Sequence, residues 1–515
     1  MKKWPLLLGL LLTGCMVGPD YDTPATKLPC AWGNDPLVSE EKPPLWEEIE
    51  WWKRYNDPIL SGLVKDTIQA NYDLKAAIAK LDIARSQLAG ADAMLAPMIS
   101  MVGSYSLNAD SLNSTSISTQ EVNGQTPVGN FAARPARYFD LVFSGFEASW
   151  EIDLFGRIRR GIESSEANVG AYHENLHNVL LSLIADVAMT YVNLRGYQQQ
   201  QKVLETSLAF WDSIYRLNQD LLKAGLVTEI DVEQALASRE KVKADLEPLK
   251  AEIKTTLHQL AALSSRPPTA LYCLLLPPKP IPHVPPKIFA GLPSDLLKRR
   301  PDIKQAERDL AAATAAIGVA KGYYFPIFSL TGNTGYQSNF LYNFISTGSG
   351  FYSVGPGFSW PIFNFGRVAA LVNAVTSRQE ELFFQYKSTL FKALADVESA
   401  LVKYKTESIR YGDLVKTYQA SREAAQATRA RFDAGKINFM TVLQADLTRQ
   451  SYELDLVKSQ TTMVLNSILL YKALGGGWEP ARKKGCPPCV AQSNNRPHQD
   501  KGTKTGPKGR NLGKR

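Results

Sequence analysis

The stretches "WEIDLFGRIRRG" (residues 150–161) and "WPIFNFGRVAAL" (residues 360–371) are two versions of one motif. At the constant offset that relates Trp150 to Trp360, the isoleucine and the Phe-Gly-Arg run of the first also recur in the second. The same offset aligns Ala224, Gly225, Gln234 and Ala235 with Ala434, Gly435, Gln444 and Ala445. Because this register holds without a gap for about 90 residues, the chain contains an internal duplication.

The duplication extends towards the N-terminus at a second, larger offset. At this offset Asp73, Ala77, Leu81 and Pro97 match Asp302, Ala306, Leu310 and Pro326. The change of offset indicates an insertion in the first copy between residues 98 and 150. Residues 110–130 are rich in Ser, Thr, Asn and Gly, so we expect the insertion to form an exposed loop.

Each copy is predicted to form a helix, two strands, a long helix, a turn and a second helix. In the first copy these elements cover residues 58–95, 98–108, 138–151, 157–224 and 228–263. In the second copy they cover residues 295–323, 325–336, 350–362, 367–434 and 437–474. A helix rises about 1.5 Å per residue, so each long helix spans roughly 100 Å, and its two shorter partners together match that length. We therefore predict a rod that packs like a coiled coil.

The strands at one end of this rod predict a membrane function. Four strands leave open edges, which cannot lie in lipid, and outer-membrane barrels of a single chain need at least about eight strands. Three copies would supply twelve strands. The predicted fold is therefore mainly α with a small β part: a trimeric 12-stranded outer-membrane β-barrel continued by a long periplasmic α-helical barrel. Trp150 and Trp360 would lie in the interfacial aromatic girdles.

The N-terminus is typical of an exported lipoprotein. A basic "MKK" precedes a short apolar run and "LTGC", which resembles a bacterial lipobox that ends at Cys15. This resemblance implies cleavage before Cys15 and its acylation. A similar resemblance to sorted bacterial lipoproteins, with Met rather than Asp at residue 16, implies the outer membrane. The predicted organisation is a signal peptide (1–14), a lipid-anchored segment (15–56), repeat one (57–266), a Pro-rich linker (267–293), repeat two (294–475) and a basic disordered tail (476–515).

The basic charge belongs to that tail. The chain has a net charge of +8, but residues 482–515 alone hold ten Lys or Arg and one Asp, so the remainder is close to neutral. The charge therefore does not indicate nucleic-acid binding by the folded part. Cys486 and Cys489 form a C-x-x-C pair in this tail, without the βαβ context of a redox site.

Several longer strings resemble one family. "CMVGPDYDTP", "WWKRYNDPILSGLV", "DLFGRIRR" and "LPSDLLKRRPDIKQAERDLAAATAAIGVAKGYYFPIFSLTGNTG" are similar to TolC-type outer-membrane channels, and specifically to the NodT-like lipoproteins of RND-type efflux systems. The resemblance covers residues from about 15 to 475. It implies a homotrimer in outer-membrane lipid that conducts small molecules passively. Its partners would be a periplasmic adaptor and an inner-membrane RND pump, and it would have no catalytic site, cofactor or metal.

The resemblance also places a gate and a docking surface at the helical turns. Adaptor contact is expected at Gly225, Leu226, Val227 and Thr228, and at Gly435, Lys436, Ile437 and Asn438. The family's acidic gate position aligns with Gln444. Asp446 lies two residues on, and a helix turns it to another face. Glu229 and Asp231 are the candidates on the first turn.

The sequence also contains features that bear on three other functions. "HENLH" (173–177) fits the H-E-x-x-H zinc-peptidase motif, but Glu205 would lie about 40 Å away on the same helix. The second copy replaces the motif's three residues with Phe383, Phe384 and Lys387. A periplasmic adaptor does not need two aromatic-rich strand pairs. A duct for type I protein secretion remains open as an alternative to an efflux duct.

Overall fold

The computed structural model describes residues 16–26, 28–29, 32–33, 50–109, 138–284 and 299–476. The chain divides into two compact units, residues 1–479 and 480–515, and every described residue lies in the first. Cys15, the Ser/Thr-rich loop 110–130, Cys486 and Cys489 lie outside the described residues, so the predictions made for them stay predictions.

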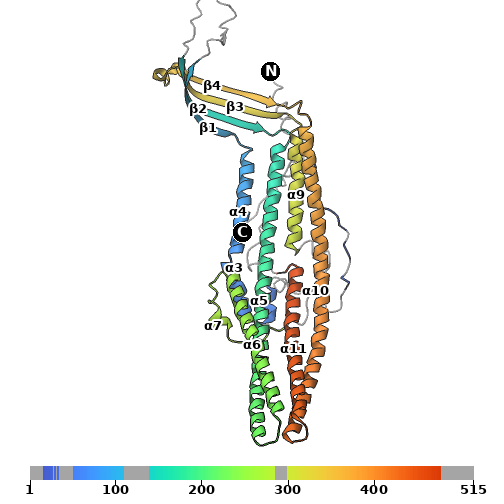
Figure 1. The fold of residues 1–515 in the computed structure, drawn as a ribbon. Helices are drawn as coiled ribbons and strands as arrows, with labels where there is room; N and C mark the ends of the chain where they lie inside the picture. Colours follow the sequence, from blue (N-terminus) through green and yellow to red (C-terminus); the bar gives the residue numbers. More distant parts are fainter. Residues whose placement is uncertain are drawn as a thin grey trace, which may run out of the picture. The chain divides into compact units, whose positions relative to one another are not determined.

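Two helices of equal length dominate the first unit. α5 (Arg157–Lys223) and α10 (Arg367–Asp433) each have 67 residues, which corresponds to about 100 Å. Figure 1 shows two shorter helices following one another beside each of them. α5 contacts all four of these shorter helices, and α10 contacts the two of the second copy. They are α4 (Tyr72–Ala93), α6 (Glu229–Leu263), α9 (Pro301–Gly322) and α11 (Phe439–Ala473).

The element bounds repeat at the two offsets found in the sequence. α5 and α6 recur as α10 and α11 at the offset that relates Trp150 to Trp360, with identical lengths. α4 recurs as α9 at the larger offset, and so does the strand that follows each of them. Turn positions, the ends of these helices and the bounds of the first strand are thus shared between the copies. The predicted order of elements is confirmed in both.

The predicted helix 58–95 is wrong in one respect, because it is broken at Asn71. α3 (Pro58–Ala70) ends there and α4 begins. The buried Asn71 side chain accepts a hydrogen bond from the Leu74 amide at 2.9 Å and donates one to the Leu263 carbonyl at 2.8 Å. Such a side chain competes with helix continuation and caps the new helix. In the second copy, the predicted helix 295–323 is interrupted at Arg300 and α9 begins at Pro301, while residues 295–298 lie outside the described residues.

The four strands form one antiparallel sheet of order β1-β2-β3-β4. Its edges are therefore β1 and β4, one from each copy. Two 3-10 turns, η3 (Leu341–Asn343) and η4 (Thr347–Ser349), connect the last two strands. The strands are β1 (Met98–Ala109), β2 (Tyr138–Ile152), β3 (Ile327–Ser338) and β4 (Gly350–Ser359).

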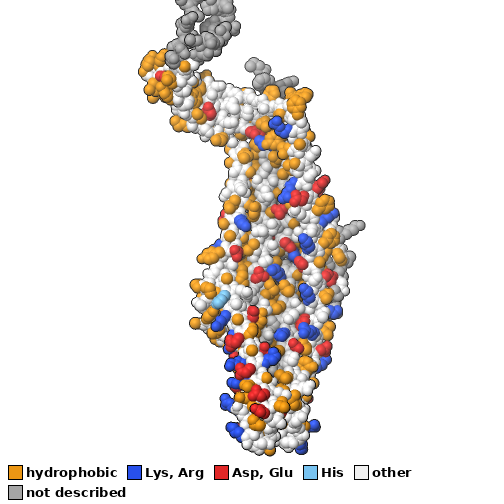
Figure 2. All heavy atoms as spheres, in the orientation of Figure 1, with side chains coloured by type: hydrophobic (Ala, Val, Ile, Leu, Met, Phe, Trp, Pro, Cys, Tyr) orange, Lys and Arg blue, Asp and Glu red, His pale blue; other side chains and the backbone are white. Residues whose placement is uncertain are grey.

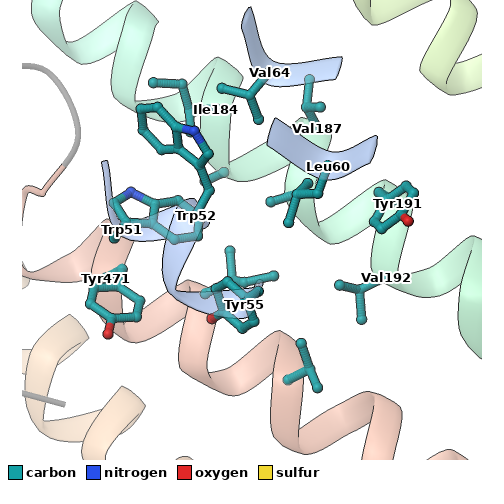
Figure 3. Close-up of a cluster of buried hydrophobic side chains, with 14 of the residues drawn as sticks. Trp51, Trp52, Tyr55, Leu60, Val64, Ile184, Val187, Tyr191, Val192 and Tyr471 are labelled. Atoms are coloured by element: carbon teal, nitrogen blue, oxygen red, sulfur yellow. The ribbon is translucent and has the colours of Figure 1, made fainter. Parts of the chain in front are cut away.

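The main apolar core lies where the short helices of each copy meet (Figure 3). The 3-10 helix η1 (Trp51–Tyr55) inserts Trp51 and Tyr55 between α5 and α11. The Trp51 ring stacks on Tyr471 with centroids 5.3 Å apart and planes 9° apart, and the Tyr55 hydroxyl lies 2.6 Å from the Ser467 hydroxyl. The string "WWKRY" thus fastens the N-terminal segment to both copies.

Smaller features complete the unit. A second apolar cluster nearer the turns contains Trp211, Val242 and Phe439. The short α7 (Tyr272–Leu275) lies in the Pro-rich linker, and the buried Arg195 donates hydrogen bonds to the carbonyls of Leu275 and Pro277. α5 contains a stretch apolar enough to span a membrane, but 61% of it is buried inside the unit, as in a core helix.

The two turns between long and short helices share one cap geometry. Gly225 and Gly435 have φ of 70° and 67°, a conformation that glycine adopts without steric penalty. At the first turn, the Gly225 amide donates to the Leu222 carbonyl and the Leu226 amide to the Leu221 carbonyl, both at 2.9 Å. The second turn repeats both bonds at the corresponding positions. This is a Schellman cap, which satisfies the last carbonyls of a helix.

Replacement of Trp51 by alanine is expected to destabilise the protein by about 3–5 kcal/mol, because it removes a buried ring and leaves a cavity beside Tyr471. Thermal unfolding of the detergent-solubilised protein, followed by circular dichroism, measures the loss. Tyr72→Ala is the control, since Tyr72 is 70% exposed and its loss should change stability by less than about 0.5 kcal/mol. Equal effects of the two substitutions would contradict the assigned core.

Replacement of Gly435 by alanine is expected to destabilise the second turn by about 1–2 kcal/mol, because an L side chain strains the left-handed conformation. A Cβ at Gly435 meets no atom within 4 Å, so the effect is conformational rather than steric. Gly412 lies within α10 and is equally open, so Gly412→Ala should stabilise by about 0.5–1 kcal/mol. Amide hydrogen exchange across the turn measures the first effect, exchange in α10 around Gly412 measures the second, and the signs should be opposite.

Candidate functional site

The sheet has one apolar and one polar face. On one face the register brings Met101 opposite Phe146, Trp150 opposite Leu330, and Phe328 opposite Phe358. The other face is mostly polar, with Ser104, Glu147, Ser149, Ser329, Thr331, Asn333 and Ser353. Figure 2 shows few charged side chains on the sheet and many on the helices. Alternation of this kind is typical of strands that separate lipid from an aqueous lumen.

The two tryptophans occupy equivalent positions at the junction of sheet and helices. The Trp150 indole donates a hydrogen bond to the Leu95 carbonyl at 2.8 Å, and the Trp360 indole donates one to the Tyr324 carbonyl at 3.0 Å. Leu95 and Tyr324 are themselves related by the larger of the two repeat offsets. An aromatic ring with a satisfied polar atom suits the boundary between lipid and water.

The residues that follow Cys15 are held at this same junction. The Val17 amide donates to the Phe155 carbonyl at 3.1 Å. Arg160, only 2% exposed, donates to the carbonyls of Val17 and Gly18 and pairs with Asp20 at 2.6 Å. Arg160 could not be singled out from the sequence, because its partners lie about 140 residues away along the chain.

Gly318 of α9 allows the backbone near Val17 and the Arg160 side chain to come close to this helix. A Cβ at Gly318 of α9 would lie 2.7 Å from both Arg160 Cγ and the Val17 carbonyl oxygen, so any side chain there would force them apart. These contacts of Val17, Gly18 and Asp20 hold the N-terminal arm, residues 16–20, at the base of the sheet.

The residues expected at the two turns lie there. Gly225, Leu226 and Thr228 are exposed, and so are Lys436 and Asn438. Leu226 and Ile230 are 72% and 67% exposed, which leaves apolar area on the first turn. Thr228 and Asn438 cap the helices that follow.

The four gate candidates differ in their surroundings. Glu229 is exposed, whereas Asp231 accepts hydrogen bonds from the Thr228 amide and hydroxyl in a capping box. Gln444 is exposed in one hollow of about 390 Å³. Asp446 is buried and lines another, of about 470 Å³. Gln444 and Asp446 thus face different sides of α11, as the helical period predicts.

Asp446 belongs to an ion-pair network that the sequence analysis missed. Its carboxylate lies 2.9 Å from Arg449 Nε, and Arg449 also pairs with Glu453 at 2.6 Å. Arg239, the counterpart of Arg449 in the first copy, pairs with Asp212. The sequence signal for this network is the arginine itself, because Arg239 and Arg449 occupy the same position in both copies and a shared position indicates a structural role.

The H-E-x-x-H motif lies in an unbroken α5. His173, Glu174 and His177 place their potential ligand atoms within 4.8 Å of one another. Burial and the nearby His177 lower the pKa of His173. Burial alone would raise the pKa of Glu174, but its contact with His177 and the charge of Lys304 lower it overall. Glu205 lies several turns further along the same helix and bonds to Gln201, so it does not join this cluster.

Comparisons with known proteins agree with this geometry. The family model for the outer membrane efflux proteins matches residues 63–266 and 292–476. Nodulation protein T of Rhizobium leguminosarum bv. trifolii is 26% identical over 92% of this chain and 97% of its own. The solvent efflux pump outer membrane protein SrpC of Pseudomonas putida is 30% identical, over 93% and 98%.

A solved structure extends the likeness to the fold. The outer-membrane channel OprN superposes with a TM-score of 0.79 and is 30% identical, over 90% of this chain and all of that one. The structural relatives are TolC-like channels with helical barrels, and SrpC is named as the outer membrane protein of a solvent efflux pump. A family match over most of the chain, together with a shared fold, shows that this chain belongs to the outer membrane efflux protein family.

Proposed function

We propose that the chain is the outer-membrane exit duct of a tripartite RND-type efflux system. One observation carries this proposal: a four-stranded sheet with an apolar and a polar face stands at the end of helices of about 100 Å. Such a sheet, closed into a ring, separates lipid from a lumen, and the helices continue the lumen into the periplasm.

Closure of the ring requires further copies of the chain. β1 and β4 are edge strands, whose unpaired amides and carbonyls cannot lie in lipid. In a homotrimer, β4 of one protomer pairs with β1 of the next, and all twelve strands are satisfied. The apolar face then points to lipid, and the serines and threonines of the other face line the lumen.

The duct works passively, and its partners supply the energy. We propose that the apolar turn around Leu226 and its counterpart around Ile437 dock the periplasmic adaptor, which joins the duct to the inner-membrane pump. The names of the relatives mention efflux of solvents, toluene, antibiotics and cations, which favours small-molecule efflux over type I protein secretion. No enzymatic step is part of this function.

At the gate, exposure favours Gln444 and Glu229 as the residues that face the lumen. Asp446 and Asp231 have structural partners, an ion pair and a helix cap. The constriction at the second turn would thus be neutral, and the acidic group would come from the first turn.

The lipid anchor at Cys15 is the third part of the proposal. Because Val17 and Gly18 are fixed beside Phe155 and Arg160, acyl chains on Cys15 would enter the membrane next to the barrel.

Replacement of Val354 by lysine should block assembly and efflux. Val354 lies on the apolar face of edge strand β4, and a lysine facing lipid costs about 2–4 kcal/mol near the bilayer midplane. Ser353→Lys is the matched control. Ser353 precedes Val354 in β4, and its side chain lies on the polar face. The readouts are trimer yield by native mass spectrometry, conductance in planar bilayers, and drug susceptibility of a channel-deficient strain that holds the cognate pump and adaptor. A silent, monomeric wild-type protein, or equal loss in both variants, would refute the duct.

Replacement of Cys15 by serine should abolish incorporation of a palmitate analogue. The variant should keep the conductance of the purified wild-type trimer, because Arg160 still holds the arm. Mass spectrometry of the N-terminal peptide checks the modification. An unmodified Cys15 in the mature wild-type protein would dismiss the anchor without affecting the duct.

A further inference from the structure

The His173, Glu174 and His177 side chains gather within one turn of α5. His177 Nδ1 lies 3.2 Å from one oxygen of Glu174, and His173 Nδ1 lies 3.9 Å from the other. The two imidazole rings lie edge to face with centroids 4.3 Å apart. The His173 side chain is 50% exposed, while Glu174 and His177 are only 16% and 13% exposed. Three potential ligands thus converge, and one of them stays accessible.

These separations suit a small divalent ion. Zinc binds imidazole nitrogen and carboxylate oxygen at about 2.0–2.2 Å, so two of its tetrahedral ligands lie roughly 3.4 Å apart. The two nitrogen–oxygen distances in the cluster, 3.2 and 3.9 Å, bracket this value. Two imidazoles and one carboxylate suit zinc, nickel or copper rather than magnesium or calcium, which prefer oxygen ligands.

The same geometry argues for binding without hydrolysis. In a peptidase of this motif, the glutamate acts as general base and a third ligand comes from elsewhere. Here Glu174 contacts both histidines and would itself be the third ligand, so no base remains beside the ion. The fourth position would hold water.

The surroundings limit how strongly an ion can bind. Lys304 of α9 acts on Glu174, and Arg85 of α4 acts on His173, so two cations oppose the incoming charge. Next to the cluster, Asn175 of α5 donates a hydrogen bond to Gln305 of α9 at 3.3 Å.

We propose that His173, Glu174 and His177 bind one divalent transition-metal ion per chain, with Zn²⁺ as the probe. The site is independent of the duct function, because it requires only that α5 is folded. It is also specific to the first copy. At the same positions, the second copy places Lys387 over the Phe383 ring at 4.2 Å, which offers no ligand.

The test is Zn²⁺ titration of the full-length, chelator-stripped protein in detergent. Cys486 and Cys489 are replaced by serine throughout, so that the tail cannot contribute thiolate ligands. Equilibrium dialysis with elemental analysis should give one bound Zn²⁺ per chain, and Zn²⁺ but not Mg²⁺ should raise the thermal midpoint. His177→Gln and His173→Gln should each weaken binding at least tenfold. His258→Gln is the matched control, because this exposed histidine contacts Tyr272 and lies outside the cluster.

Unchanged Zn²⁺ binding in a folded His173→Gln variant would overturn the proposal, and so would the absence of bound Zn²⁺ from the Cys486→Ser, Cys489→Ser parent protein. His173 is half exposed, so its replacement should leave folding intact, as circular dichroism can verify. A conducting trimer that binds no Zn²⁺ would refute the metal site and leave the duct standing.

Discussion

Backbone hydrogen bonding in lipid is the constraint on which the proposed assembly depends. Within the described part of the chain, β1 and β4 are unpaired on their outer sides, and lipid offers no partner for their amides and carbonyls. Gene duplication supplies two strand pairs per chain but does not close a ring. Oligomerisation does, and each protomer must then present one edge from each copy. The helices would follow the same arrangement around the ring, because each strand pair is connected to one long and two shorter helices.

The helical wall depends on a match of lengths. Each 67-residue helix is accompanied by a 22-residue and a 35-residue helix, and a gap remains between the two. In both copies the main apolar core lies at this gap, where the Trp51 segment, α3 and the linker helix pack. Because α4, α5, α9 and α10 contact one another in sequence as a single layer, there is no deep interior, and the middle region holds the larger of the two apolar clusters.

The order of elements was predictable because hydrophobic period, prolines and glycines all agreed in two copies. Asn71 was missed, since a buried asparagine that caps a helix looks like any polar residue until its partner, Leu263, is known. Pro248 lies within the predicted helix 228–263. The helix α6 continues through this residue because the packing of the surrounding helix outweighs one missing hydrogen bond. The partners of Arg160 and Asp446 depend on distant segments or on side-chain direction, which periodicity alone does not specify.

Comparison of the two copies distinguishes residues that have the same structural role in both from residues whose role exists in one copy only. Trp150, Gly225 and Arg239 have identical counterparts that make a similar hydrogen bond, turn or ion pair. Arg160 has no such counterpart, since the second copy has Ala370 there. This difference has a reason, because a chain has one N-terminus and needs one clamp for it. The cluster at His173 is asymmetric in the same way. A feature that occurs in only one copy is not needed for the helix packing that both copies share. Its role is therefore expected in a contact or ligand that only that copy meets.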